Sequence, residues 1–159
     1  MLNANDPKLK SWVEVPKDSD FPIQNLPFGI FKTDYLSPVA GVAIGNHILD
    51  LVYLHENGFL DGLGLPSGIF NQKELNGFLD LGWKKGREVR ERISELLRHN
   101  NDELKSNMVA REMALVNMNE VEMQLPVKIC NYTDFYSSEE HATNAVSYTH
   151  LTLPTNREV

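Results

Sequence analysis

The chain has 159 residues, of which 42% are hydrophobic and 23% are charged, a composition that predicts a soluble globular protein with a core of its own. Its net charge of -7 argues against a nucleic-acid partner, because such a partner requires a basic surface. No stretch approaches the ~18 apolar residues of a membrane span, and the amino-terminal residues lack the apolar core of a secretory signal. Cys130 is the single cysteine, so no internal disulfide can form. We expect a cytoplasmic protein in which this thiol is buried as a small hydrophobic group.

The first part of the chain predicts an edge strand followed by a loop. Residues 12–15 alternate apolar and polar side chains and stop at Pro16, which indicates a short edge strand. Pro22 and Pro27 exclude a helix from the turn-rich stretch 18–29. Four apolar residues of this stretch are expected to anchor it to the core: Phe21, Ile23, Leu26 and Phe28.

Three short strands are expected next, at 30–32, 40–44 and 48–51. Gly45 and Asn46 both tolerate positive φ, which favours a tight hairpin turn between the last two strands. Several short strands joined by tight turns predict a small β-barrel or roll.

The middle of the chain predicts helices and loops. Residues 51–57 form a short helical pattern closed by a glycine, and His55 on it is expected to be a solvated surface residue. The glycine-rich stretch 58–68 predicts a loop. Asn71 is expected to cap a helix that ends near Leu81.

The best helical pattern of the chain covers residues 83–99. Its apolar stripe consists of Val89, Ile93, Leu96 and Leu97. Glu88 and Arg92 are spaced for an i, i+4 ion pair on the solvated face. Asp102 is expected to cap one more helix, which carries Leu104, Met108 and Leu115.

The last third of the chain predicts a domain boundary. Residues 121–125 alternate like a strand and meet Pro126, and a new strand is expected at 127–130. We therefore expect an amino-terminal domain over 11–125 and the truncated start of a second domain over 126–145.

The stretch that follows, NYTDFYSSEEHATN, carries the chemistry. Asp134 and Tyr136 lie at i and i+2, so on an extended segment both side chains leave the same face. Ser137 and Glu140 have the spacing of a capping box, which predicts a helical turn with His141 near its start. A carboxylate, a phenol and an imidazole can bind a hard cation, contact a substrate oxygen and move a proton. Taken alone, the pattern is weak: it often arises by chance, and a lone histidine is more often structural than catalytic.

Two stretches in the expected order resemble the fumarylacetoacetase family. The segment from Asn131 to Asn144 resembles its active-site entry, and SDFPIQNLPFG, from Ser19 to Gly29, resembles its amino-terminal signature. The resemblance implies an α+β fold: a small SH3-like β-barrel or roll with several helices, followed by the start of a β-rich catalytic domain. It also implies metal-dependent hydrolysis of a carbon–carbon bond in 4-fumarylacetoacetate, during tyrosine and phenylalanine catabolism.

By this resemblance Asp134 is a ligand of Ca²⁺ or Mg²⁺, Tyr136 contacts the substrate and His141 is the catalytic base. The substrate would be a small β-diketo acid, and the full-length enzyme would be a homodimer with neither nucleic-acid nor membrane partners. The family's other metal ligands would follow beyond the end of this chain, so we expect the 159-residue chain alone to be inactive. A different hydrolase, isomerase or decarboxylase of the wider superfamily and a non-catalytic SH3-like interaction module are the alternatives.

The resemblance stops after Asn144. The run from Val146 to Thr155 matches, codon for codon in one frame, the end adapter used in transposon-based sequencing libraries. We hypothesise that residues 146–159 are translated adapter rather than native protein, which would deprive His150 of any functional role.

Overall fold

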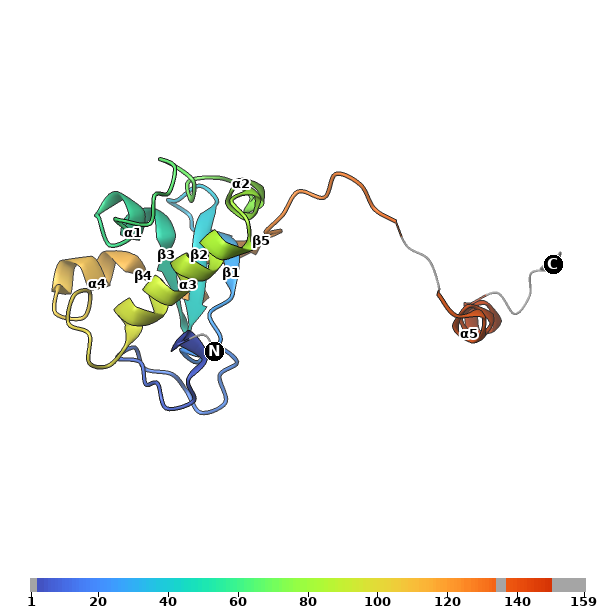
Figure 1. The fold of residues 1–159 in the computed structure, drawn as a ribbon, viewed down its shortest axis with the longest axis horizontal. Helices are drawn as coiled ribbons and strands as arrows, with labels where there is room; N and C mark the ends of the chain where they lie inside the picture. The colour runs from blue at the N-terminus through green and yellow to red at the C-terminus, as the bar shows by residue number, and fades with distance from the viewer. Residues whose placement is uncertain (1–2, 134–136, 150–159) are drawn as a thin grey trace. The chain divides into compact units, whose positions relative to one another are not determined.

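The structure is a computed structural model, and it describes residues 3–133 and 137–149. The chain divides into two compact units, Met1–Lys128 (unit 1) and Ile129–Val159 (unit 2). Among the described residues, unit 1 holds a β-sheet with four α-helices, and unit 2 holds α5 (Glu139–Thr149) (Figure 1). No helix in the described ranges has the length and apolar character needed to cross a lipid bilayer.

The sheet of unit 1 is antiparallel throughout, with the strand order β4-β3-β2-β1-β5 among the described residues. Its strands are β1 (Phe28–Lys32), β2 (Val39–Ile44), β3 (His47–Asp50), β4 (Leu115–Asn117) and β5 (Glu122–Gln124). Antiparallel strands combined with separate helices define an α+β fold, as the sequence predicts. The three predicted central strands are β1, β2 and β3.

The predicted hairpin joins β2 to β3 through Gly45 and Asn46, with Ile44 opposite His47. Gly45 has φ of 55°, and no described non-glycine residue has a positive φ. Positive φ at only the first central residue is the pattern of a type II′ turn, whose twist matches that of the flanking strands. A side chain at Gly45 would also meet the Glu14 carbonyl oxygen, so both the positive φ and the lack of space require glycine at this position.

The helices of unit 1 are α1 (Leu51–Glu56), α2 (Asn76–Asp80), α3 (Trp83–Leu97) and α4 (Met108–Ala114), and two short 3-10 turns are η1 (Asn3–Asn5) and η2 (Met118–Glu120). The longest, α3, crosses one face of the sheet (Figure 1). The main core lies between them: Ile30, Val42 and Leu49 from the sheet pack in one cluster with Val89 and Ile93 from α3. The loop anchors Ile23 and Leu26 are also buried there, at 2% and 1% exposure, whereas Phe21 and Phe28 are half-buried.

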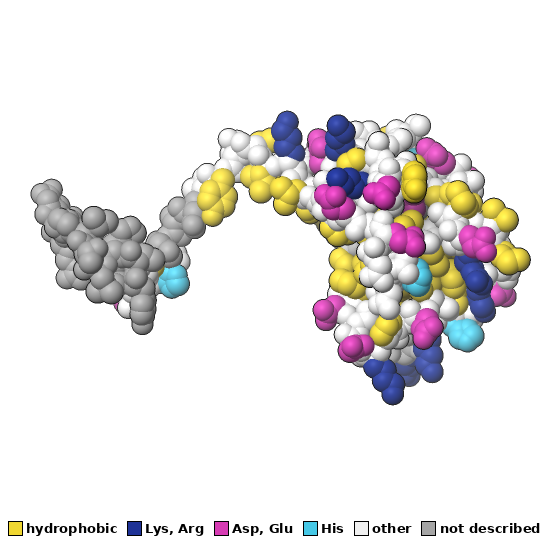
Figure 2. Space-filling model, turned by 180° about the vertical axis from the view of Figure 1, so that it is seen from behind, with side chains coloured by type: hydrophobic (Ala, Val, Ile, Leu, Met, Phe, Trp, Pro, Cys, Tyr) yellow, Lys and Arg dark blue, Asp and Glu magenta, His cyan; other side chains and the backbone are white. Residues whose placement is uncertain are grey.

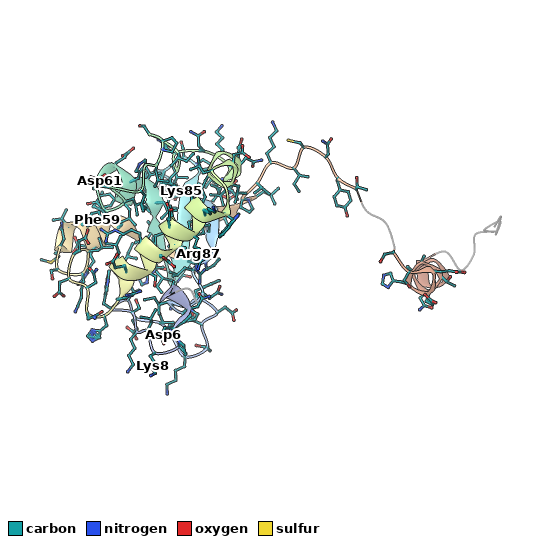
Figure 3. The ribbon with its side chains drawn as sticks, in the orientation of Figure 1. Asp6, Lys8, Phe59, Asp61, Lys85 and Arg87 are labelled. Carbon is teal, nitrogen blue, oxygen red and sulfur yellow. The ribbon has the colours of Figure 1, made fainter. Side chains whose placement is uncertain are left out.

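Helix α3 has the predicted buried face. Its four stripe residues are fully buried: Val89, Ile93, Leu96 and Leu97. The predicted pair between Glu88 and Arg92 is wrong, because Glu88 binds Lys85 and Arg92 binds Glu95 and Glu103. Lys85 and Arg87 are labelled on α3 in Figure 3. Lys85 Nζ also donates to the carbonyl of Leu63, at 2.6 Å, in the loop that contains Asp61.

The predicted edge strand at 12–15 is wrong. Only Ser11 forms a β-bridge, and its partner is Arg98, just after α3. The Trp12 N–H donates to the Leu97 carbonyl at 3.1 Å and its indole N–H donates to the Leu96 carbonyl at 2.8 Å. This segment therefore pairs with the carboxyl end of α3, whose last carbonyls have no partners within the helix.

The predicted cap at Asn71 is wrong, because the helix begins at Asn76 and its N-cap residue is Leu75. The Leu75 N–H donates to the carbonyl of Pro126, at 2.7 Å, instead of continuing a helical ladder. Leu75 and Phe78 are buried, whereas Leu79 is 56% exposed. A hydrogen bond to a residue distant in the sequence thus takes the place of the helical hydrogen bond that the local pattern predicts.

The helix predicted to start at Asp102 also begins later. The Asn107 side chain accepts from the Ala110 N–H at 3.0 Å and caps α4. Leu104 is buried before this helix, Met108 is 66% exposed on it, and Leu115 follows it in β4, opposite Leu49. Leu115 therefore belongs to the sheet and not to the predicted helix.

The predicted strand at 127–130 is absent from the described structure. The Lys128 N–H donates to Asn76 Oδ1 at 2.8 Å, and Asn76 Nδ2 donates to the Lys128 carbonyl at 3.0 Å. A side-chain amide thus satisfies the backbone groups that a neighbouring strand would have used.

A second, smaller apolar cluster lies on a different part of the sheet from the main core. Its buried members are Phe31, Val39 and Ile48, and it also includes Met118 and Val121. Among the described α-helices, only α1 contributes to it, through Val52. The helices therefore cover one face of the sheet far more completely than the other.

Candidate active-site segment

His141 lies in the first turn of α5, and it is exposed. Its N–H donates to Ser138 Oγ at 3.2 Å, and the Ala142 N–H donates to the Ser138 carbonyl at 3.1 Å. These two bonds are those of an N-cap residue. The predicted helix start is confirmed, but the cap is Ser138 rather than Ser137.

Glu140 participates in the cap differently from the prediction. The Ser138 hydroxyl donates to Glu140 Oε2 at 2.8 Å. A hydrogen bond from its own backbone N–H and the bond from Ser138 hold the pKa of Glu140 below its usual range. A carboxylate is favoured at this end of a helix, because the unpaired N–H groups carry partial positive charge.

Asp134 and Tyr136 lie outside the described residues, so the common face predicted for their side chains stays a prediction. Of the three predicted site residues, the structure places His141 alone, on a helix start where its side chain is open to solvent.

The described residues do not contain a divalent-metal site. Nowhere in the described ranges do three or more histidine, cysteine, aspartate or glutamate side chains group so as to hold a metal ion. Ca²⁺ takes six to eight oxygen ligands and Mg²⁺ about six. Asp134 could add one such oxygen, so any cation here would need further ligands.

The surroundings predicted for two side chains, Cys130 and His55, are wrong. Cys130 is exposed rather than buried, because it follows Val127, the last of the described residues to pack against the main core. His55 is half-buried rather than solvated, with its ring edge-on to Phe70 at a centroid distance of 5.8 Å. Neither side chain lies in the candidate segment.

The fold and this segment define an α+β domain followed by a short helix that presents a histidine at its amino-terminal end. Residues 24–126 match the family model described as Fumarylacetoacetase N-terminal, and the chain belongs to this family. The resemblance inferred from the two sequence stretches is thereby confirmed.

Curated relatives match more of the chain than the family model does. The chain is 42% identical to a fumarylacetoacetase of Dictyostelium discoideum over 137 residues, which is 86% of this chain and 32% of the relative. It is 44% identical to one of Arabidopsis thaliana over 138 residues (86% and 33%) and 41% identical to one of Homo sapiens over 135 residues (84% and 32%). The chain therefore spans about a third of the length of these relatives.

Proposed function

We propose that the full-length protein is a fumarylacetoacetase, a hydrolase that cleaves a carbon–carbon bond of 4-fumarylacetoacetate to give fumarate and acetoacetate in tyrosine and phenylalanine catabolism. The observation that carries this proposal is the identity of 41% to 44% with enzymes of that name from a slime mould, a plant and an animal, across 84% to 86% of this chain. The substrate would be a small β-diketo acid. A cytoplasmic homodimer and an SH3-like form of the five-stranded sheet belong to the same proposal.

His141 would act as the general base. In this role its imidazole takes a proton from water, and the water oxygen attacks a carbonyl carbon of the diketone. The carbon–carbon bond then breaks, and its electron pair leaves with the acetoacetate part as an enolate, which takes up a proton. The exposed position of His141 at the start of α5 supports this role, because water and substrate can reach its ring.

Tyr136 would contact a substrate oxygen, and Asp134 would provide one ligand of a Ca²⁺ or Mg²⁺ ion. Such an ion would supply positive charge near the diketone oxygens. The remaining ligands would come from the rest of the full-length protein, since the described residues do not complete a site.

Two alternatives explain less. Another hydrolase, isomerase or decarboxylase of the wider superfamily shares the metal chemistry, but the match of residues 24–126 to the fumarylacetoacetase amino-terminal family favours the first proposal. A non-catalytic SH3-like module would need a groove of exposed aromatic side chains. Phe31, an aromatic residue of the second cluster, is fully buried.

Hydrolysis of fumarylacetoacetate by purified proteins tests the proposal. We expect no turnover by the 159-residue chain, because one proposed base, His141, and one proposed metal ligand, Asp134, lack the charge-stabilising groups of a complete site. A full-length version, in which the native continuation follows Asn144, should be active. There His141→Ala should lower kcat by about 10²–10⁴-fold, the usual contribution of a general base.

His99→Ala is the matched control, because His99 is also exposed but lies in unit 1. It should leave kcat unchanged. Turnover by the 159-residue chain that disappears with His141→Ala would contradict the proposal, as would a full-length protein with no activity.

A further inference from the structure

The sheet of unit 1 carries an apolar cleft of about 240 Å³. All its lining residues are apolar or glycine, and they include Phe31, Ile48, Met118, Val121 and Met123. The 4-fumarylacetoacetate of the proposed reaction carries carboxylates, which would find no charged or polar partner here. The chemistry of the cleft therefore suits apolar side chains of a protein rather than that substrate.

One wall of the cleft continues as an exposed apolar strip, which consists of Val121, Met123 and Leu125. Met123 is opposite Phe31 in the register of β5 with β1. Since side chains alternate along an extended segment, Val121, Met123 and Leu125 face the same side as Phe31. Met123 is 58% exposed and Leu125 is 84% exposed. Figure 2, seen from behind α3, shows hydrophobic side chains near the point where the chain leaves unit 1.

The strand that carries this strip also has an open edge. β5 pairs with β1 on one side, and within the described ranges no strand pairs with its other side. An edge strand presents free N–H and C=O groups, and proteins usually protect such edges. Lys32 and Glu122 form an ion pair at 2.9 Å, and such charged side chains can protect an edge strand. This pair lies on the face of the sheet opposite Met123, because Glu122 and Met123 are consecutive.

The position of the strip in the chain indicates what covers it. The family match ends at residue 126, immediately after Leu125, whereas the curated relatives are about three times as long as this chain. A segment of the continuation can therefore reach the strip without a long connection. Because it belongs to the same polypeptide, its effective concentration would exceed that of a second copy or a free peptide.

We infer that the cleft and the apolar strip form an intramolecular docking surface for the carboxyl-terminal two thirds of the full-length protein. The occupant places apolar side chains in the cleft, against Met123, and covers the open edge of β5. The inference rests on family membership and on the full-length protein of the proposed function, but it does not depend on which reaction that protein catalyses.

Methionine oxidation tests the inference with controls inside the same chain. Met123 on the strip and Met108 and Met113 on α4 are 58%, 66% and 59% exposed, so all three should react with hydrogen peroxide at similar rates in the 159-residue chain. In the full-length protein we expect several-fold slower oxidation of Met123 and unchanged rates at Met108 and Met113, measured by peptide mass spectrometry.

Three outcomes would overturn the inference. Met123 could react equally fast in both proteins, which would leave the surface free for an external peptide. Its protection in the 159-residue chain could rise with protein concentration, which would identify a second copy as the occupant. Equal protection of all three methionines would show a general effect rather than docking.

A substitution provides an independent measurement. Leu125→Lys should leave the melting temperature of the 159-residue chain unchanged and lower that of the full-length protein, whereas Met108→Lys should be neutral in both. An unchanged melting temperature of full-length Leu125→Lys would count against docking. Neither readout uses hydrolysis, so an inactive full-length protein that protects Met123 would reject the proposed function and keep this inference.

Discussion

Gly41 lies in β2 at a point where the sheet leaves no room for a side chain. It lies opposite Gly29 in the pairing of β1 with β2. A Cβ atom at Gly41 would lie 2.5 Å from Ile48 Cγ2 and 2.8 Å from Phe31 Cε1. Phe31 is fully buried and Ile48 is 4% exposed, so neither side chain can move into solvent without leaving its cluster.

Gly41→Ala should therefore destabilise unit 1. We expect a loss of about 1–3 kcal/mol in the free energy of unfolding, the usual effect of inserting a methyl group into a packed core. Urea denaturation followed by circular dichroism measures this loss.

Gly86→Ala is the matched control. Gly86 lies inside α3, and nothing within 4 Å would meet its new Cβ. Alanine is the better helix former, so this variant should gain up to about 1 kcal/mol. Equal effects of the two substitutions would show that the space around Gly41 is not what requires glycine there.

Asp50 caps α1 from a buried position. Its Oδ1 accepts from the Val52 N–H at 2.8 Å and from the Tyr53 N–H at 3.0 Å, while the residue is 8% exposed. Burial raises the pKa of Asp50 above its ordinary value, the two N–H groups partly offset this, and nearby Glu56 adds to the rise. The folded chain therefore holds this proton to higher pH than the unfolded chain does.

This shift predicts a pH-dependent effect of Asp50→Asn. The contribution of Asp50 to stability is complete below its ordinary pKa and is lost as the pH rises through its raised folded pKa. Asparagine caps a helix about as well and does not titrate. Across this window, from acid to neutral pH, Asp50→Asn should therefore become more stable relative to the wild type, as measured by urea unfolding at a series of pH values.

Asp50→Ala separates capping from titration. It should be less stable than Asp50→Asn by about 1 kcal/mol at every pH, because the cap is lost. A difference between Asp50→Asn and the wild type that stays constant with pH would contradict the titration argument.

At the scale of one element, α3 owes its stability to its buried face. Ile93 is fully buried in the main core, whereas Glu91 is half exposed and reaches Arg87 only at 3.9 Å. A surface ion pair of this kind contributes little, since water screens it.

Ile93→Ala should lower the free energy of unfolding by about 2–5 kcal/mol, because it removes buried methyl groups and leaves a cavity. Glu91→Ala should change it by less than about 0.5 kcal/mol, as is usual for surface substitutions. Thermal or urea unfolding of both variants makes the comparison, and a larger effect of Glu91→Ala would mean that the buried face of α3 is misassigned.

At the scale of the whole molecule, unit 1 contains a complete core. The buried hydrophobic residues of the described chain lie between Ala4 and Ala114, and Val127 packs against them. The hydrogen bonds between Asn76 and Lys128 close the unit at its carboxyl end.

A chain truncated after Lys128 should therefore fold. We expect one cooperative urea transition whose midpoint agrees with that of the 159-residue chain. A large drop in the midpoint would show that residues beyond 128 contribute to the stability of unit 1.

The sequence by itself determined the elements whose signals are local. The glycine of the β2–β3 turn, the alternating strands on either side of it and the apolar stripe of α3 each specify a structure within a few residues. The helix start before His141 was also readable, to within one residue, because a serine cap acts on backbone N–H groups only two or three positions away. The family was readable from two short stretches.

The tertiary structure alone decided the elements whose backbone partners are distant in sequence. Trp12 bonds to the end of α3, Leu75 bonds to Pro126, and Lys128 bonds to the Asn76 side chain. Each of these contacts replaces a strand or a helical turn that the local pattern predicted. The reason is that a backbone N–H or C=O needs a hydrogen-bond partner, and a well-placed distant carbonyl or amide provides one as well as a regular ladder does. The apolar strip of β5 belongs with these, because its alternation is visible in the sequence but its exposure is visible only in the fold.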